Sequence, residues 1–535
     1  RVRMKYDVIV VGGGIAGLTS AAFLAKSGLK ILLCEKEDQV GGLVGSFCYH
    51  DFVFDAGIRA MENSGVLFPM LKQLGLEIEF CKSKVSIGME ESVVHISSKQ
   101  SVDAYQQMLV SKFPDETVAI AKIMDVVEKS MTYMDVLYGI DNPLFLDLRN
   151  DSVYMRKTLL PWLFKYLATL GKIKRLNTPV ERYLSKLTNN NALIDMIAQH
   201  FFTQTPASFA LSYFCLYLDY NYPKGGTGTL IAKLSDYILN HGGEIKANTR
   251  VKTIDPSSNT IVDEHGTVYT YNDLIWAADS KTLYASLSNL DALPHKRYEQ
   301  IKKRAAFLAD KKGANSVLTL YLTLEKDKSY FEQIHAPHFF YTPVKTGLSA
   351  LPLQALRQAD GTYCDQQATL FDWIQEYLRL TTYEISIPVM RDEQLAPAGK
   401  TGLIISTLME HSLVKHMEQL GLYDAFKSLC RDAMIRTLTD SIYPGLGDRI
   451  MDAFVSTPLT LERRTGNADG AITGWAFTNT PIPAVSSMSK ITKSIRTPIP
   501  HVVQAGQWAY SPSGFPIAIL TGKIAADFVL RKRKR

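Results

Sequence analysis

The stretch YDVIVVGGGIAGLTSAAFLAKSGLKILLCE, at residues 6–35, decides the fold of this chain. Its β-branched run at 6–11 is typical of a strand buried on both faces, and a helical pattern follows the turn after it. In that turn, Gly12, Gly14 and Gly17 match the pattern G-x-G-x-x-G. Glycine permits a tight turn at the first position, a close approach of the backbone to a pyrophosphate at the second, and close packing of helix on strand at the third. The stretch therefore predicts a unit that binds a dinucleotide.

An acidic residue supports this prediction. A second apolar strand, residues 30–34, ends at Glu35, which stands 21 residues after Gly14. At about this spacing a carboxylate accepts hydrogen bonds from the adenosine ribose, and it would repel a 2′-phosphate. The N-terminus of the first helix would meanwhile offer free N–H groups and a positive dipole end to the phosphates.

Composition and charge exclude several other classes of protein. The chain has 535 residues, of which 46% are hydrophobic and 21% charged, which is typical of a globular protein with more than one domain. Five of its six net positive charges stand at 531–535, so the body lacks the basic face of a nucleic-acid binder. The six cysteines form no CxxC pair and stand near no His at zinc-ligand spacing, so no metal site is predicted.

The sequence after Glu35 carries a family resemblance. A glycine pair, Gly41-Gly42, begins the run GGLVGSF at 41–47, and FVFDAG follows at 52–57. The dinucleotide turn, the glycine pair and the later F-D-x-G together resemble the amine-oxidase/phytoene-desaturase superfamily of FAD enzymes. The resemblance implies that a second stretch of backbone contacts the phosphates and ribityl chain of the cofactor.

Further segments, in the order of that family, resemble its carotenoid and retinoid branch. They are YPKGGTGTL at 222–230, HGGEI at 241–245 with TRVKTI at 249–254, LIWAAD at 274–279 and VVQAGQWAYSPSGFPIA at 502–518. The resemblance therefore covers the whole chain and implies FAD as the cofactor. The implied cofactor contacts are Gly12, Gly14, Ile15, Ala16, Gly17, Glu35, Lys36, Gly41, Gly42, Leu43, Asp55, Gly57, Val251, Ala278, Gly506, Gln507, Phe515, Pro516 and Ile517.

Two positions depart from the family pattern. The residue after the glycine pair is often basic in the superfamily, whereas here it is Leu43, which removes one charged contact to the cofactor. Desaturases usually read F-D-x-G-P, whereas here Gly57 is followed by Ile58 and Arg59. At the second position the sequence looks more like the retinol-saturase and carotenoid-isomerase subgroup. This makes a simple dehydrogenation less favoured as the predicted reaction.

The order of the segments implies an α/β fold with two interleaved domains. We expect a discontinuous, Rossmann-type (GR2-like) FAD-binding domain from residues 1–75, 220–290 and 495–535. The pieces between them, 76–219 and 291–494, would form a substrate-binding domain with a mixed sheet and a helical cap. Strands are predicted at 315–324 and 402–409, and a helix at 114–138.

Three residues near the flavin-facing segments are candidates for the catalytic site. If the substrate is a polyene, orientation against the flavin supplies much of the catalysis, and aromatic faces stabilise a cation-like transition state. On this basis Arg59, Trp475 and Trp508 are the candidates. Arg59 could equally be a salt-bridged loop arginine, and the tryptophans could be core residues.

Two aromatic stretches suit a lipophilic substrate or a membrane surface. Residues 159–170 (LLPWLFKYLATL) are flanked by basic residues, a pattern that fits either an interfacial helix or an ordinary core helix with a solvated edge. The aromatic run at 201–222 fits a core or a cavity wall. The basic tail at 531–535 could add to membrane attachment or simply be solvated. With no apolar run long enough to span a bilayer, we expect a cytoplasmic protein that can contact a membrane peripherally.

Together these patterns predict an FAD-dependent oxidoreductase. It would desaturate, saturate or isomerise C–C bonds of a lipophilic polyene or isoprenoid by hydride transfer at flavin N5, and the electron acceptor or donor stays open. One alternative is an amine-oxidase-like oxidase of a small substrate. Another, from a different class, is a non-catalytic lipid-binding protein similar to the GDP-dissociation inhibitors.

Overall fold

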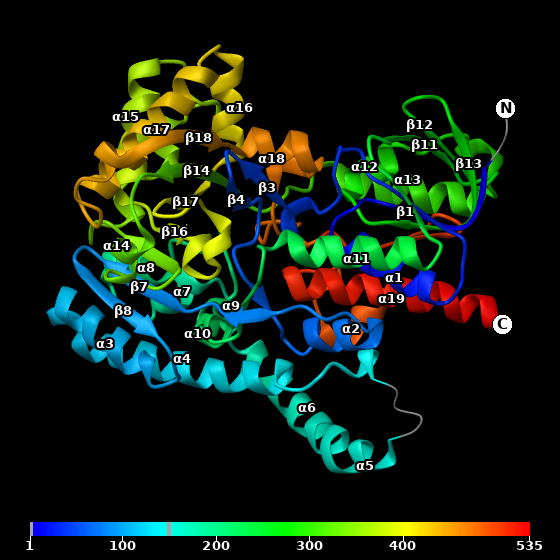
Figure 1. Cartoon of the computed structure of the whole chain (residues 1–535), viewed down its shortest axis with the longest axis horizontal. Coiled ribbons are helices and arrows are strands. Elements are labelled where there is room, and N and C mark those ends of the chain that lie inside the picture. The colour runs from blue at the N-terminus through cyan, green and yellow to red at the C-terminus, as the bar shows by residue number, and fades with distance from the viewer. Residues whose placement is uncertain (1–3, 147–150) are drawn as a thin grey trace.

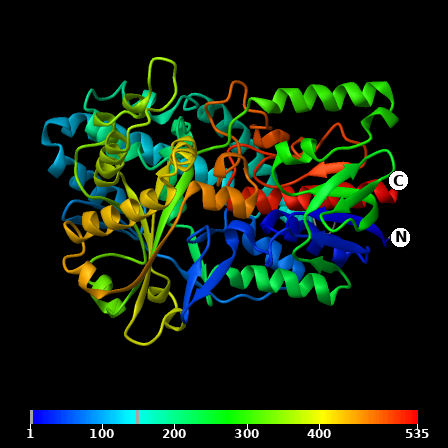
Figure 2. The same cartoon turned by 90° about the horizontal axis from the view of Figure 1, so that it is seen from above.

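The computed structural model describes residues 4–146 and 151–535. Two large sheets with their helices lie along the long axis of the molecule, and β1 and α19, from opposite ends of the sequence, lie together at one end (Figures 1 and 2). The mixed α/β class expected from the sequence is confirmed.

The first sheet is built around the strand that opens the chain. Its order is β10 (Glu244–Lys246), β2 (Ile31–Cys34), β1 (Met4–Val11), β13 (Val268–Trp276), β12 (Thr260–Asp263) and β11 (Val251–Asp255), and β19 (Val502–Gln504) pairs with β13. β10, β2, β1, β13 and β19 run parallel, whereas β12 and β11 form an antiparallel edge.

Alternating side chains of β1 bury both faces of this sheet. Val8 and Val10 belong to a core shared with α1 (Ile15–Lys26), α11 (Gly228–Asn240) and α19 (Phe515–Lys534). Tyr6, Ile9 and Val11 belong to a second core on the other face. The strand is therefore buried on both faces, as its sequence predicts.

The second sheet is also mixed. Its order is β18 (Ile450–Ser456), β14 (Ser316–Leu324), β17 (Thr401–Met409), β16 (Tyr383–Ser386), β15 (His338–Thr342), β7 (Val85–Met89) and β8 (Ser92–Ile96), and only the β15–β7 pair is parallel. α15 (Gln367–Leu380) and α17 (Tyr423–Thr439) pack in the large apolar core of this sheet, and α3 (Ser101–Lys112) and α4 (Thr117–Tyr138) pack beside β7 and β8.

Short strands link the two sheets. The hairpin of β3 (Ser46–Tyr49) and β4 (Phe52–Asp55) places Phe52 and Phe54 in the core of the second sheet. A small sheet orders β5 (Met61–Glu62), β9 (Tyr220–Pro223) and β6 (Phe80–Lys82). The other α-helices of four or more residues in the described chain are α2 (Leu67–Leu74), α6 (Leu160–Lys174), α7 (Val180–Leu184), α8 (Asn191–Ala198), α9 (Ala207–Ala210), α10 (Tyr213–Tyr217), α12 (Ser280–Ala285), α13 (His295–Ala309), α14 (Lys328–Glu332), α16 (His411–Gln419) and α18 (Pro458–Thr465).

Sheet membership bears on the proposed division into domains. Every strand of the first sheet falls inside residues 1–75, 220–290 and 495–535, and every strand of the second falls inside 76–219 and 291–494. The domain boundaries themselves stay a prediction.

Candidate functional site

One large cavity lies where the parallel strands of the first sheet end. β1, β2, β13 and β19 all run toward it, and the residues that follow them line it. In open α/β sheets, ligands bind outside the carboxyl ends of the strands. The cavity holds about 1270 Å³, which is more than the ~300–1,000 Å³ of an ordinary small-ligand pocket. It therefore has room for a large cofactor and a second molecule.

The glycine turn forms one wall of this cavity. The backbone of Gly12 has a φ of +108°, which favours glycine. A Cβ on Gly17 would lie 1.8 Å from the carbonyl oxygen of Gly12, so only glycine lets α1 approach the turn. A Cβ on Gly14 would meet no atom within 4 Å, because this position faces open space.

Two helices present free N-termini to the cavity. α1 begins after Gly14 and α19 after Gly514, and neither of these residues caps its helix with a side chain. The first N–H groups of a helix then have no partner within it and favour an anion. Both glycines line the cavity, so the site fits a ligand with several phosphate oxygens.

The C-terminal turn lies directly against the N-terminal one. Gly506 has a φ of +99°, and a Cβ built on it would lie 3.4 Å from the Cβ of Ala16. The Gly506 N–H donates to the hydroxyl of Thr521 at 2.9 Å, which fixes the turn on α19. Two buried polar atoms nearby, Oε1 of Gln507 and Oγ of Ser513, have no hydrogen-bond partner among the described residues, although both residues line the cavity. Unpaired buried polar atoms are costly, so these two fit a bound polar ligand.

Glu35 is held in a fixed orientation beside the cavity. Its Oε2 accepts a hydrogen bond from the Gly13 N–H at 2.8 Å, and its Oε1 accepts one from the Glu37 N–H at 3.0 Å. Burial raises the pKa of Glu35, although these backbone bonds favour the ionised form. The carboxylate is therefore placed to accept a further hydrogen bond from a ligand hydroxyl.

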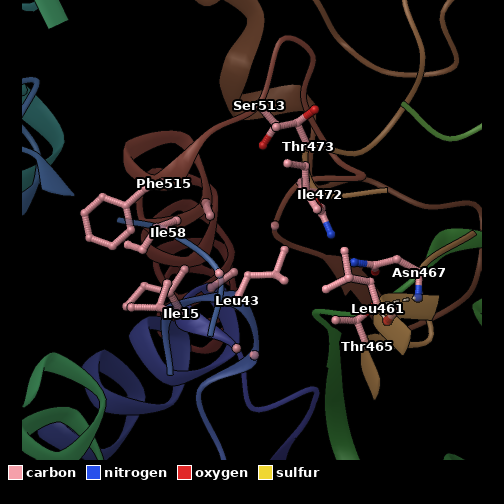
Figure 3. A pocket seen from close by; sticks show the side chains of 18 of the residues that line it. Ile15, Leu43, Ile58, Leu461, Thr465, Asn467, Ile472, Thr473, Ser513 and Phe515 are labelled. Carbon is pink, nitrogen blue, oxygen red and sulfur yellow. Dashed lines mark hydrogen bonds between the residues drawn. The ribbon is translucent and has the colours of Figure 1, made fainter. Parts of the chain in front are cut away.

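Most of the cofactor contacts implied by the sequence lie on this cavity. Figure 3 shows Ile15, Leu43, Ile58 and Phe515 on one side and Leu461, Thr465 and Asn467 on the other. The lining includes Gly12, Gly14, Ile15, Ala16, Glu35, Lys36, Gly42, Leu43, Gly57, Val251, Ala278, Gly506, Gln507, Phe515, Pro516 and Ile517.

Three implied contacts do not line the cavity and have structural roles. Gly17 packs α1 on its strand, as described above. Gly41 has a φ of +131° and its N–H donates to the Gly13 carbonyl at 2.8 Å, so it holds the two glycine turns together. Asp55 is completely buried, and its carboxylate accepts hydrogen bonds from Tyr222 and Thr227. Oδ2 accepts from Tyr222 on β9 and Oδ1 from Thr227 in the loop before α11, so the bonds of Asp55 hold these segments together, and its direct contact with a cofactor stays a prediction.

Lys36 lines the cavity, but its ammonium group is engaged elsewhere. Nζ donates to the carbonyl of Arg463 at 2.7 Å and pairs with Glu37 at 2.9 Å. This bond ties the segment after β2 to α18. The charge of Lys36 is therefore already paired and does not depend on a ligand.

The candidate catalytic residues separate into two groups. Arg59 and Trp508 line the cavity, whereas Trp475 does not. Trp475 is 1% exposed and packs edge-on against Trp508, and its indole N–H donates to the Trp508 carbonyl at 3.1 Å. Of the two interpretations that the sequence left open, this packing favours a core residue for Trp475, which stands behind Trp508 and supports it.

Arg59 is buried rather than ion-paired in a loop. Its guanidinium donates to the Asp55 carbonyl at 2.9 Å and to the Ser406 hydroxyl at 3.1 Å. Ser406 lies opposite Glu384 in the register of β16 and β17. The positive charge of Arg59 is thus placed beside the carboxylate of Glu384.

An ionisable cluster on the cavity wall was not predicted from the sequence. His338 Nε2 and Glu384 Oε1 are 3.0 Å apart, and the imidazole stacks on the ring of Tyr220 at 5.0 Å. Burial lowers the pKa of His338. Burial alone would raise the pKa of Glu384, but His338 and Arg59 lower it. A neutral imidazole therefore donates to an ionised carboxylate.

Glu62 completes this cluster. It lines the same cavity, and burial raises its pKa to about 7, with further contributions from the negative charges of Asp219 and Glu384. A carboxyl group of this kind is partly protonated near neutral pH and can both donate and accept a proton there. No short sequence motif predicts this cluster, because its residues lie on β5, β15 and β16, which are far apart in the sequence.

An aromatic wall continues the cavity away from the glycine turns. We give this name to Met134 and Tyr138 of α4 together with Phe202, Phe209, Tyr213 and Tyr220. The expectation that the 201–222 run forms a cavity wall agrees with this placement. Within residues 4–146 and 151–535, no three His, Cys, Asp or Glu side chains are placed to hold a metal ion.

Comparison with known proteins matches this arrangement. Residues 15–530 match the family described as flavin containing amine oxidoreductase. The chain is 26% identical to the chloroplastic prolycopene isomerase of Daucus carota, over 87% of this chain and 71% of that protein. It is 21% identical to the phytoene desaturase of Fusarium fujikuroi, over 99% of this chain and 90% of that protein.

Solved structures show the same fold. A cofactor-binding redesign of putrescine oxidase superposes with a TM-score of 0.61 at 13% identity, covering 99% of this chain and all of that one. The family match spans nearly all of the described structure, from the first residue of α1 through the C-terminal turn and most of α19. The chain therefore belongs to the flavin-containing amine oxidoreductase family, and its cofactor is FAD.

Proposed function

We propose that this flavin-dependent oxidoreductase acts on a C–C bond of a lipophilic polyene or isoprenoid, by desaturation, saturation or isomerisation. The observation that carries the proposal is the aromatic wall, which continues the same cavity beyond the cofactor-binding turns. The names of the relatives, a prolycopene isomerase and a phytoene desaturase, support a substrate of this class.

The two glycine turns and the free N-termini of α1 and α19 would hold the phosphates of FAD, and Glu35 would accept hydrogen bonds from its ribose. Gln507 and Ser513, whose polar atoms are unpaired, would bind further polar groups of the cofactor. When bound, the flavin accepts or donates a hydride.

The protein would orient the substrate and manage protons. Tyr213, Tyr220 and Phe209 offer flat apolar faces to a conjugated chain, and Trp508 offers an electron-rich face to a cation-like transition state. Glu62 would donate a proton to carbon, or accept one in the reverse direction, while the charge of Arg59 favours the ionised form of Glu384.

Anaerobic titration of the purified, yellow protein tests the proposal. We expect a carotenoid or retinoid to change the flavin absorbance, by reducing the oxidised form or by reoxidising the chemically reduced form. Polar substrates of similar concentration should leave the spectrum unchanged. A spectrum that responds to no lipophilic polyene in either redox state would overturn the proposal.

A second candidate function rests on the acids in the cavity. Glu62, Glu384 and the tyrosines around them could surround an ammonium group, as an amine-oxidase-like flavin oxidase of a small substrate would require. Steady peroxide production with an amine panel, without any response to polyenes, would favour this function.

A further inference from the structure

A helical arm projects from the body of the protein. It comprises α5 (Ser152–Tyr154), a π-helical segment (Met155–Leu159) and α6 (Leu160–Lys174), and it extends beyond α4 in Figure 1. In the described parts of the chain, nine large apolar side chains are strongly exposed, and five of them belong to this arm. Such clustering departs from the scattered exposed apolar residues of an ordinary surface. The five are Val153, Leu160, Leu163, Phe164 and Leu167.

Four of these side chains form one stripe along α6. Their positions, 160, 163, 164 and 167, have the i, i+3, i+4, i+7 spacing of a single helix face. Phe164 is 74% exposed and Leu167 is 57% exposed. A buried core helix, the alternative left open by the sequence, would not leave this face in solvent. The stripe therefore needs a partner outside the described chain.

The opposite face of α6 is the one that packs on the protein. Tyr166 and Thr169 are buried there. The indole N–H of Trp162 donates to the carbonyl of Val136 on α4, and its ring packs on Tyr166 at 4.8 Å. Since the opposite face of α6 already makes the contacts with the rest of the protein, the exposed stripe is not the face by which α6 packs on this chain.

The charge of the arm identifies the chemistry of the partner. Between Asp151 and Glu181 the sequence contains no acidic residue and six basic ones, Arg156, Lys157, Lys165, Lys172, Lys174 and Arg175. An apolar helix stripe flanked only by cations fits the headgroup boundary of an anionic bilayer. Among the described residues, no helix is long and apolar enough to cross a bilayer, so contact would be confined to the interface.

The foot of the arm lies beside the cavity. Tyr166, on the buried face of α6, packs on Trp162, and Trp162 donates to the carbonyl of Val136, which lies between Met134 and Tyr138, two residues that line the cavity. Tyr138 is also a member of the aromatic wall. A surface that binds lipid at the arm would therefore stand next to the apolar part of the site.

We propose that the exposed stripe of α6 docks this protein onto an anionic lipid bilayer, with the helix lying in the plane of the interface. The docking itself needs no assumption about the reaction. Transfer of a lipophilic substrate from the bilayer to the aromatic wall is a consequence that rests on the proposed function.

Sedimentation of the FAD-loaded full chain with vesicles tests the docking. We use vesicles of phosphatidylcholine alone and of phosphatidylcholine mixed with phosphatidylglycerol, without substrate. The wild-type protein should bind the mixed vesicles, and Phe164→Ser combined with Leu167→Ser should weaken this binding about ten-fold or more, because two exposed side chains lose their apolar contact with lipid.

Matched variants test whether vesicle binding depends on this face of α6 or only on the number of exposed apolar or charged side chains. Val118→Ser with Leu239→Ser removes two equally exposed apolar side chains from α4 and α11 and should leave vesicle binding unchanged. Lys165→Gln with Lys174→Gln should weaken binding to mixed vesicles by about five-fold for each charge lost. Lys302→Gln with Lys303→Gln, on exposed positions of α13, is the control for charge.

Three outcomes would overturn the docking proposal. The first is a wild-type protein that does not sediment with mixed vesicles. The second is equal binding by the Phe164/Leu167 variant. The third is a dimer of the wild-type protein in solution that the same variant abolishes, since a second copy would then cover the stripe. Flavin content and the anaerobic spectral response report separately on the proposed function, so its failure cannot be mistaken for loss of docking.

Discussion

At the scale of single residues, a buried carboxylate can serve the site without touching a ligand. Asp55 accepts hydrogen bonds from the Tyr222 hydroxyl at 2.9 Å, the Thr227 N–H at 3.0 Å and the Thr227 hydroxyl at 2.9 Å. These bonds join the end of β4 to the loop that begins α11. In this loop Gly225 and Gly226 have φ angles of +90° and +95°, which would be strained for any residue other than glycine.

Removal of this carboxylate should destabilise the fold. Asp55→Ala leaves two buried donors, the Tyr222 hydroxyl and the Thr227 N–H, without an acceptor, which should lower the free energy of unfolding by about 3 kcal/mol. Denaturant unfolding of the cofactor-free protein measures the change. Asp432→Ala, on the exposed face of α17, is the matched control and should change it by less than about 0.5 kcal/mol. Equal effects of the two substitutions would contradict the role assigned to Asp55.

Glu62 should make stability depend on pH. Its pKa rises from 4.5 to about 7 on folding, so between these values the folded chain holds a proton that the unfolded chain has lost. The stabilising contribution is therefore complete below about pH 4.5 and is lost as the pH rises through about 7. Glu62→Gln removes this dependence and should gain roughly 3 kcal/mol relative to wild type between pH 4 and pH 8. A constant difference between the two proteins across this range would contradict the prediction.

The same carboxyl group should govern the reaction if it donates a proton. The wild-type rate of substrate turnover should fall as the pH rises above about 7, because Glu62 then ionises. Glu62→Gln should lower this rate about a hundred-fold or more and abolish the limb near pH 7. Flavin content should stay normal in the variant. A variant that keeps the wild-type pH limb would show that another group donates the proton.

At the scale of elements, the turn between β1 and α1 assigns different tasks to its glycines. A side chain on Gly14 would enter the cavity, whereas one on Gly17 would collide with the Gly12 carbonyl. The turn thus combines a surface for the ligand with a contact that holds the helix. Both tasks follow from local sequence, which is why the G-x-G-x-x-G pattern predicts them.

Alanine substitutions should separate these two tasks. Gly14→Ala should leave the stability of the cofactor-free protein within about 1 kcal/mol of wild type while weakening FAD binding at least ten-fold, because its methyl group projects into the cavity. Gly17→Ala should instead destabilise the cofactor-free protein by several kcal/mol, about 3 or more. Fluorescence titration with FAD and denaturant unfolding measure the two effects. Loss of stability with unchanged FAD binding in Gly14→Ala would contradict the assignment.

At the scale of the whole molecule, the site closes only when segments from opposite ends of the sequence meet. β13 pairs with β1 on one side and with β19 on the other. The Ser20 hydroxyl on α1 donates to the Gly522 carbonyl on α19 at 2.6 Å, and a Cβ on Gly522 would lie 2.5 Å from the carbonyl of Ala16. Both free helix N-termini then point into one cavity.

FAD should therefore protect both turns together. Hydrogen exchange of the protein with and without FAD should show slower exchange at residues 12–17 and at 506–517 when FAD is bound, because both segments line the cavity. The exposed surface of α13, no residue of which lines the cavity, is the internal control. Protection of only one of the two turns would contradict a shared cofactor site.

The sequence predicts the parts of the site that depend on local geometry, and it misses those that depend on register. The dinucleotide turn and the C-terminal turn carry glycines whose positions have a backbone reason, so their placement could be expected. Glu62, His338 and Glu384 meet only because β5 pairs with β9 and β15 with β16, and no spacing in the chain encodes this. Trp475 and Trp508 look alike in sequence, and only their packing shows that one lines the cavity and the other supports it.

The pairing of β19 with β13 has a consequence for biosynthesis. A ribosome adds about 5–20 residues per second, so β13 waits on the order of 10 to 50 seconds for β19, which follows it by roughly 230 residues. During that interval the edge of β13 that later pairs with β19 is exposed in the nascent chain. An unpaired strand edge of this kind favours chaperone binding and aggregation. Flavin binding would accordingly be complete only after residues 506–517 have been made, because they form one wall of the cavity.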